Sequence, residues 1–214
     1  MELGRTQVIA FSKRLLRSGG AGAKMKSIQT ERLLLRPWKN ADLDAFAEMN
    51  ADWRVMEHFG STSSRKQRKT LMARIRRHFS QHGSGFWAVE VKGGDPFAGF
   101  VGLRKIAFDV HFSPAVEIGW RLAHAHWGLG YATEAASAAL RFAFLEAGLD
   151  EIVSFTNAGN HRSTAVMERI GMHHAAVDDF DHPYLPEGHP LRRQVLYRLR
   201  RSDWLSAQSG DEGR

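Results

Sequence analysis

Short runs in which apolar and polar residues alternate are separated by longer segments with apolar residues three or four positions apart. Alternation is typical of half-buried strands, and the longer spacing is typical of amphipathic helices. The alternating runs predict seven strands, at 28–38, 86–91, 98–106, 115–122, 151–157, 172–177 and 194–204. The longer segments predict four helices, at 42–50, 64–81, 132–145 and 160–171. The pattern therefore favours a mixed α/β fold.

The segment 116–148 combines a predicted strand, a loop with two glycines and an Ala-rich helix that stops at Gly148. Gly128 and Gly130 stand immediately before the helix, where they allow a tight turn whose backbone N–H groups point outward. The helix N-terminus adds roughly half a positive charge. Together these features predict a site for a phosphate or pyrophosphate group.

The predicted strands on either side of this helix, 115–122 and 151–157, are joined by a crossover connection. Such connections are right-handed and make the two strands parallel, whereas the strands before them are expected to form an antiparallel meander. Ligands of open α/β sheets bind beyond the carboxyl ends of parallel strands. We therefore expect Leu122 and Asn157 to lie beside the ligand.

The spacing of the glycines excludes two other phosphate-binding motifs. A dinucleotide fingerprint needs a third glycine where Thr133 stands, and a Walker loop needs Gly-Lys-Ser/Thr, which the chain lacks. Instead, Glu-Ile-Gly-Trp at 117–120 and His-Trp-Gly-Leu-Gly-Tyr-Ala-Thr-Glu-Ala at 126–135 resemble the GNAT family of N-acetyltransferases. Within that family they are similar to the RimJ/RimL-like branch of ribosomal-protein acetyltransferases.

Two further motifs carry the same resemblance, which covers about 28–204. Thr-Glu-Arg-Leu-Leu-Leu-Arg-Pro at 30–37 is similar to the start of RimJ/RimL-like domains, and Asn-x-x-Asn-x-x-Ser at 157–163 precedes Ile-Gly-Met. The resemblance implies a GNAT fold, in which a largely antiparallel seven-stranded sheet is flanked by about four helices and has a splayed parallel pair at the cofactor site. We expect one acetyltransferase domain at 25–206, between a flexible extension at 1–24 and a flexible tail at 207–214.

The resemblance also implies that the cofactor is acetyl-CoA and that the glycine loop binds its pyrophosphate. In the family this loop begins with Gln or Arg, but Ala125 stands at that position here, so one side-chain contact is missing or comes from elsewhere. The residues expected to contact the cofactor are Trp120, Arg121, Leu122, Trp127, Gly128, Leu129, Gly130, Tyr131, Ala132, Asn157, Asn160 and Ser163.

The family places a catalytic glutamate in the Glu-Ile-Gly segment, which makes Glu117 the candidate base for the attacking amine. Alternation puts Glu117 and Arg121 on one face of the strand, so a purely electrostatic pair of these two residues is an equal alternative. Many members protonate the departing thiolate with Tyr, which the helix at 160–171 lacks. Ser163 is the candidate here, and the alternative is a first-turn surface hydroxyl. Backbone N–H near Leu122 is expected to stabilise the oxyanion.

Three other features near the site have expected roles. Asn160 stands at the start of a helix and is expected to cap it. Glu134 lies in the first turn of the Ala-rich helix, where the dipole stabilises any acid, so we expect a structural role. The segment 178–193 contains three prolines and is longer than a hairpin needs. In the family this loop borders the acceptor pocket, and substrate contact is favoured over a spacer.

The amino-acid composition limits the reaction mechanisms that are open to this chain. The chain has no Cys, which excludes thiolate catalysis and suits a reducing cytoplasm, where we expect the protein to act. It also lacks a Gly-x-Ser-x-Gly elbow and metal-ligand spacing, so we expect direct transfer to a primary amine in a ternary complex, without a metal. We expect the acceptor to be a protein N-terminus or a small-molecule amine. We expect the protein to be a monomer or a homodimer. No apolar run approaches the ~18 residues of a membrane span.

The net charge of +7 is concentrated near the start of the chain. The segment 1–24 holds five basic residues and one acidic residue, which accounts for +4. A transit-peptide-like role is therefore an alternative to a flexible extension. The helix at 64–81 is also basic, but a solvated surface is favoured over an RNA contact. Two other functions stay open: a non-catalytic acyl-CoA-binding sensor and, third, a nucleic-acid-binding module.

Overall fold

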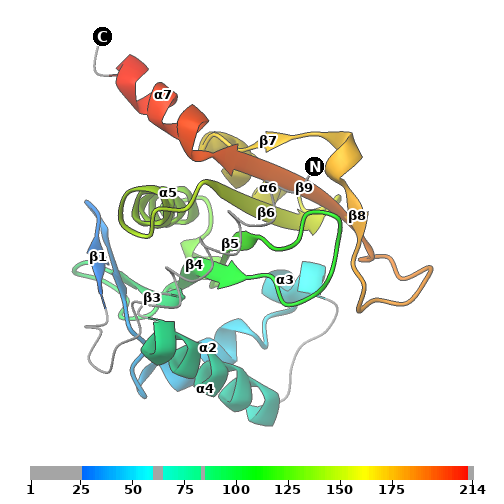
Figure 1. Cartoon of the computed structure of the whole chain (residues 1–214). Helices are drawn as coiled ribbons and strands as arrows, with labels where there is room; N and C mark the ends of the chain where they lie inside the picture. The colour runs from blue at the N-terminus through cyan, green and yellow to red at the C-terminus, as the bar shows by residue number, and fades with distance from the viewer. Residues whose placement is uncertain (1–25, 60–64, 83–84, 212–214) are drawn as a thin grey trace.

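A computed structural model describes residues 26–59, 65–82 and 85–211 (Figure 1). Nine strands form one sheet in the order β1-β2-β3-β4-β5-β6-β9-β7, with β8 paired to β9. Among the described residues only β5 and β6 pair in parallel. The prediction of a mixed, largely antiparallel sheet with one parallel pair is confirmed. The strands are β1 (Ile28–Gln29), β2 (Leu33–Arg36), β3 (Phe86–Val91), β4 (Gly99–Lys105), β5 (Val116–Leu122), β6 (Glu151–Asn157), β7 (His173–His174), β8 (Phe180–Asp181) and β9 (Arg193–Arg200).

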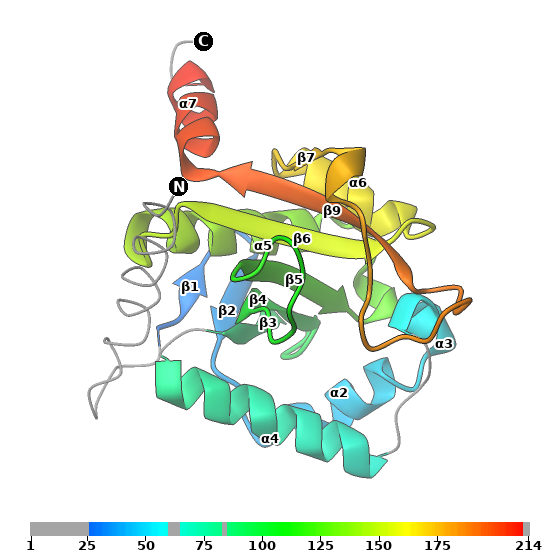
Figure 2. The same ribbon diagram turned by 45° about the vertical axis from the view of Figure 1, so that its right-hand side comes forward.

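Helices cover both faces of the sheet. Figure 2 shows α2 and α4 on one face and α5 and α6 on the other. The helices are α2 (Asp42–Met49), α3 (Trp53–Met56), α4 (Arg65–His82), α5 (Tyr131–Arg141), α6 (His161–Arg169) and α7 (Arg201–Asp211). Short helical turns are η1 (Glu57–Phe59), η2 (His124–His126), η3 (Phe142–Glu146) and η4 (Ala176–Asp178).

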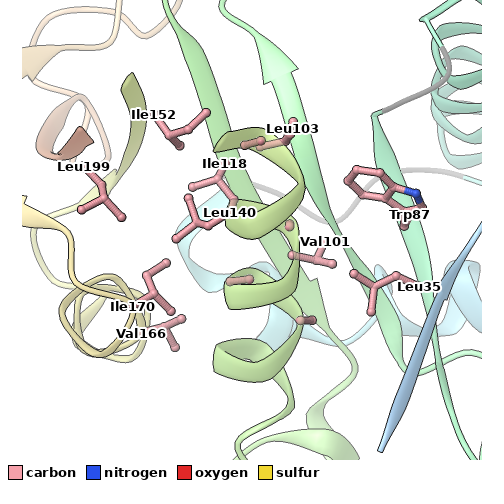
Figure 3. Packing of buried hydrophobic residues seen from close by; sticks show 14 of the residues in the cluster. Leu35, Trp87, Val101, Leu103, Ile118, Leu140, Ile152, Val166, Ile170 and Leu199 are labelled. Carbon is pink, nitrogen blue, oxygen red and sulfur yellow. The ribbon is translucent and has the colours of Figure 1, made fainter. Parts of the chain in front are cut away.

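The main hydrophobic core lies between α5 and the sheet (Figure 3). Ile118 of β5, Leu140 of α5 and Ile152 of β6 are fully buried there, and each contributes about 1.5–3 kcal/mol when buried. On the opposite face, the rings of Trp38 and Phe46 pack edge to face at 5.1 Å. Because β5 is packed on both faces, its position relative to both helix layers is fixed.

The single strand predicted at 28–38 is divided into β1 and β2. Between them, the side chains of Thr30 and Arg32 bind the carboxylate of Glu134 in α5, at 2.6 Å for Thr30 Oγ1 and 2.7 Å for Arg32 Nε. The chain turns back at this point, so Ile28 pairs with Leu35. The prediction of one strand was wrong here, because the Leu33 N–H bonds to Thr30 Oγ1 at 2.9 Å and closes a turn, which Glu134 then holds against α5.

Two predictions near the C-terminus also need correction. The strand predicted at 172–177 is only β7, which η4 follows, and the strand predicted at 194–204 ends at Arg200. Helix α7 begins there because Trp204 turns into the core, with its ring 5.5 Å from that of Phe144. The tail expected at 207–214 is therefore helical as far as Asp211. The extension at 1–24 and residues 212–214 lie outside the described residues.

Candidate active site

The parallel strands β5 and β6 separate after a short paired region. The ladder joins Glu117 to Val153, and Ser154 Oγ donates a hydrogen bond to the Ile118 carbonyl at 3.0 Å. Alternate residues of a strand direct their peptide groups to the same side. Because Ile118 directs its carbonyl toward β6, the N–H groups of Trp120 and Leu122 also point to that side, beyond the paired region. They are positioned to bind a ligand between the two strands.

The loop before α5 has the conformation that its glycines predict. Gly128 and Gly130 have φ angles of +75° and +79°, and Gly130 is the N-cap of α5. A Cβ atom at Gly128 would meet no atom within 4 Å, so the backbone is open to an approaching group. With the N-terminus of α5 behind it, this bare backbone has the geometry of an anion-binding site.

Glu134 holds this loop against the start of the sheet. Its Oε1 accepts a hydrogen bond from the Arg32 N–H at 2.9 Å, and Arg32 Nη1 donates to the Leu129 carbonyl at 2.9 Å. Burial alone raises the pKa of Glu134, but hydrogen bonds from Thr30 and Arg32 outweigh burial and lower the pKa. Glu134 is therefore ionised at neutral pH, in the structural role expected of it.

A cavity of about 670 Å³ begins at the glycine loop and extends along the end of β5 to α3 and η1. Of the residues expected to contact a cofactor, all line this cavity except Leu129 and Asn157. The Leu129 side chain is 49% exposed at the tip of the loop. The Asn157 amide is engaged elsewhere, since Nδ2 donates to the Pro190 carbonyl at 3.1 Å and Oδ1 accepts from the Gly159 N–H at 3.0 Å.

The first turn of α6 forms the wall opposite the glycine loop. Asn160 is the N-cap, and its Oδ1 accepts a hydrogen bond from the Ser163 N–H at 3.3 Å, so the predicted capping role is confirmed. The Asn160 amide also donates to Thr156 Oγ1 at 2.9 Å, which anchors the cap to β6. Ser163 follows on the same turn, and both residues line the cavity.

Glu117 is buried on the face of β5 that points away from α5. Its Oε2 accepts a hydrogen bond from Arg104 Nη2 at 2.7 Å. Burial raises the pKa of Glu117, and the positive charge and hydrogen bond of Arg104 oppose this rise without cancelling it. The alternative pair with Arg121 is wrong, because Arg121 bonds instead to Asn50 Oδ1 of the α2 C-cap. Cross-strand pairing brings Arg104 directly opposite Glu117.

Neither Glu117 nor Gly119, its neighbour on the same face, lines the cavity. Gly119 lies between Glu117 and Arg121 on the same face of β5. A Cβ atom at Gly119 would lie 3.5 Å from Glu117 Oε1. The Phe86 ring lies 3.6 Å from the same position, so this ring bounds the space beside the carboxylate.

The far wall of the cavity was missed by sequence reasoning. It consists of Arg54, Val55, His58 and Phe59 from α3 and η1. These helical segments are too short to produce an apolar repeat, so no pattern identified them. Thr133, His126, His161, Arg162, Ala165, Val166 and Arg169, which also line the cavity, belong to elements that were predicted. Arg162 lies over the Trp127 ring at 4.8 Å.

No residue of the proline-rich segment 178–193 lines the cavity, so its expected contact with the substrate stays a prediction. His182 packs against Phe108 with ring centroids 5.0 Å apart. Burial lowers the pKa of His182, and the charge of Arg104 lowers it further. His182 is therefore neutral at pH 7, and the segment that carries it lies near the Glu117–Arg104 pair.

Comparisons with known proteins agree with this architecture. The family model of the acetyltransferase (GNAT) domain matches residues 32–173. The protein YkkB of Bacillus subtilis (strain 168) is 30% identical over 154 residues, which are 72% of this chain and 88% of that protein. The FsC-acetyl coenzyme A-N(2)-transacetylase of Aspergillus fumigatus is 38% identical over 93 residues, 43% of this chain and 39% of that protein. The crystal structure of a GNAT-family acetyltransferase from Bacillus anthracis has a TM-score of 0.68 and 26% identity, and the match covers 83% of this chain and 99% of that one.

The sheet with its separated β5–β6 pair, the glycine loop before α5 and the family match define one class of protein. The chain belongs to the GNAT family and is an acetyltransferase.

Two features of other protein classes are absent from the described residues. None of the described helices combines the length and the apolar character that crossing a membrane requires. In the same part of the chain, no three His, Cys, Asp or Glu residues are grouped so that they could hold a metal ion.

Proposed function

We propose that this chain transfers the acetyl group of acetyl-CoA to a primary amine, by direct attack in a ternary complex. The observation that carries the proposal is the cavity that joins the glycine loop to the separated end of β5. The loop supplies bare backbone and a helix N-terminus for a pyrophosphate. The N–H group of Trp120 supplies a hydrogen bond for an extended arm. The name of the A. fumigatus relative, which includes acetyl coenzyme A and transfer to N(2), supports this donor and acceptor class.

Acetyl-CoA would supply an acetyl thioester that is already activated. The protein then has to orient the amine, remove its proton, stabilise the oxyanion and protonate the departing sulfur. Glu117 accepts the proton of the amine, directly or through a water beside Gly119. Its raised pKa suits this role, because a base works best when its pKa is near the working pH. The N–H of Leu122 stabilises the negative charge on the carbonyl oxygen. Ser163 Oγ donates a proton to the departing sulfur and recovers one from the nitrogen of the tetrahedral adduct, so its hydroxyl is restored.

The motifs at 30–37 and 157–163 support assignment to the RimJ/RimL-like branch. In this chain the first motif has a physical function, because Thr30 and Arg32 hold Glu134 while Arg36 forms a bidentate pair with Asp42 at 2.8 and 2.9 Å. A protein N-terminus is the acceptor that this branch implies, and a small-molecule amine is the other candidate.

An assay with the full chain tests the proposal. Acetyl-CoA binding is measured by calorimetry, and free-thiol release is followed with a panel of peptides, amino acids and small amines. We expect binding together with thiol release for at least one amine. Tight binding without turnover on any amine would favour the acyl-CoA sensor, and salt-sensitive RNA binding without coenzyme A affinity would favour the nucleic-acid module.

Ser163→Ala tests the proton donor. We expect acetyl-CoA affinity close to wild type and turnover lowered by about 100-fold, because the thiolate then leaves without a proton. The loss should be smallest for acyl donors whose thiol is a good leaving group. Thr164→Ala is the matched control, since its hydroxyl bonds to the His161 carbonyl at 3.2 Å and does not line the cavity. Equal turnover in both variants would assign Ser163 to the surface.

A further inference from the structure

Arg121 lines the cavity between the part formed by the glycine loop and the part formed by the α3–η1 wall. Its guanidinium stacks on the Phe59 ring at 3.7 Å and lies 5.5 Å from the Phe100 ring. Nη1 donates a hydrogen bond to Asn50 Oδ1. Nε is buried and makes no hydrogen bond. The edge of the guanidinium formed by Nε and Nη2 thus has no partner in the described part of the chain.

None of the described acids in or beside this wall is bonded to Arg121: Glu57 of η1 is 50% exposed and lies 3.7 Å from His58 Nε2. Asp52 bonds to Arg54 Nη2 at 2.6 Å, and Glu117 bonds to Arg104. Burial lowers the pKa of Arg121 to about 10, so the side chain still carries a full charge at neutral pH. A buried cation without a counter-ion is costly, because the protein has replaced its water with aromatic rings and one amide.

The buried Arg36 shows what this chain does when a guanidinium has only a structural role. Its Nη1 and Nη2 bond to both carboxylate oxygens of Asp42, and its Nε bonds to Glu90 at 2.5 Å. Both charges of such a pair are compensated inside the protein. Arg121 is half-buried, has no carboxylate partner among the described residues and lines the cavity, which Arg36 does not.

We propose that Arg121 binds a carboxylate of the acceptor, so that the preferred acceptors carry an amine and a carboxylate in one small molecule. This inference rests on the proposed acetyl transfer to an amine. The fork of Nε and Nη2 matches the two oxygens of a carboxylate in geometry and charge. Arg121 and Glu117 lie on the same face of β5 with Gly119 between them, so an acceptor anchored at Arg121 lies on the face that carries the proposed base and passes its proton to Glu117 through water.

The position of Arg121 also separates this role from cofactor binding. Its side chain points to the face that carries α2, where Asn50 and Phe59 hold it. The glycine loop and α5 lie on the other face, which Ile118 and Leu122 pack against. The side chain of Arg121 is therefore assigned to the acceptor and not to the cofactor.

The test compares free amino acids with their C-terminal amides as acceptors for wild type and for Arg121→Met. Arg121→Met keeps the apolar stem and removes the charge. We expect the ratio of kcat/KM for acid over amide to fall about 10- to 100-fold, mainly through KM of the acid, with acetyl-CoA affinity unchanged. Arg121→Lys restores part of the preference, because it keeps the charge without the fork. Arg141→Met, which removes an exposed arginine at the other end of α5, leaves the ratio unchanged.

Several outcomes would overturn the inference. These are equal losses for acids and amides, no preference in wild type, and loss of acetyl-CoA affinity in Arg121→Met, which would make Arg121 part of the cofactor site. If wild type acetylates none of the amines, the proposed function fails separately. Calorimetry on coenzyme A-loaded protein then still decides the role of Arg121, because acid-over-amide binding that Arg121→Met abolishes supports it and equal binding refutes it. Melting temperatures identify a variant that fails to fold.

Discussion

Gly128→Asp is expected to lower the affinity for coenzyme A by about 100- to 1000-fold. Two unit charges of the same sign 4 Å apart repel by about 4 kcal/mol near a protein surface, and tenfold in affinity corresponds to about 1.4 kcal/mol. The new carboxylate would stand where the pyrophosphate of the proposed cofactor approaches. Because nothing lies within 4 Å of a Cβ atom at Gly128, the substitution displaces no neighbouring side chain.

A second glycine provides the control for backbone strain. Gly93, in the turn between β3 and β4, has a φ angle of +72° and also has nothing within 4 Å of a Cβ atom. Gly93→Asp therefore introduces the same residue at nearly the same φ angle, away from the cavity. Calorimetry should give wild-type affinity for Gly93→Asp. Wild-type affinity for Gly128→Asp as well would show that the pyrophosphate binds elsewhere.

Glu117→Gln is expected to lower turnover by about 10²- to 10⁴-fold, the usual contribution of general base catalysis, and to leave acetyl-CoA affinity close to wild type. The base acts on the amine, so the loss should shrink as the pH rises and the free amine accumulates without help. In wild type the rate should rise with pH as the Glu117 carboxylate loses its proton. Burial raises its pKa, so this rise should occur at higher pH than for an ordinary glutamate.

Arg104→Gln gives an independent test of the same assignment. The charge and hydrogen bond of Arg104 keep the pKa of Glu117 lower than burial alone would set it. Removing them should move the rise in the pH–rate profile to still higher pH. Full activity of Glu117→Gln at every pH would mean that the base is another group and that Glu117 only balances Arg104.

The central part of the site could be predicted because its strand, loop and helix are consecutive in the sequence. The strand, the two glycines and the helix at 116–148 each have a local signature, and the structure brings their residues together around one cavity. Residues whose partners depend on register could not be found this way. Four strand residues span about 13 Å, so Glu117 and Arg121 share a face without contact, whereas directly opposite residues lie about 5 Å apart. Only the pairing of β4 with β5 identifies Arg104 as the partner.

The acceptor side was harder to predict for a related reason. The α3–η1 wall is made of short helical turns, and it faces the end of β5 only after α2 has packed on the sheet. Asn50, which holds Arg121, is buried at the C-cap of α2 and gives no signal in sequence beyond the end of a helix. A short apolar repeat predicts that a helix is present, but it does not predict which distant strand that helix covers.

Odd- and even-numbered residues of β5 point their side chains to opposite faces of the sheet. Even-numbered side chains, such as Ile118 and Leu122, pack toward α5, whereas the odd-numbered Glu117 and Arg121 point to the opposite layer. Under the proposed function, substitutions at Arg121 would change which amine is accepted and leave the donor side intact, whereas Glu117 has to be kept for catalysis. Natural divergence or protein engineering could then alter the acceptor one residue at a time, without rebuilding the coenzyme site.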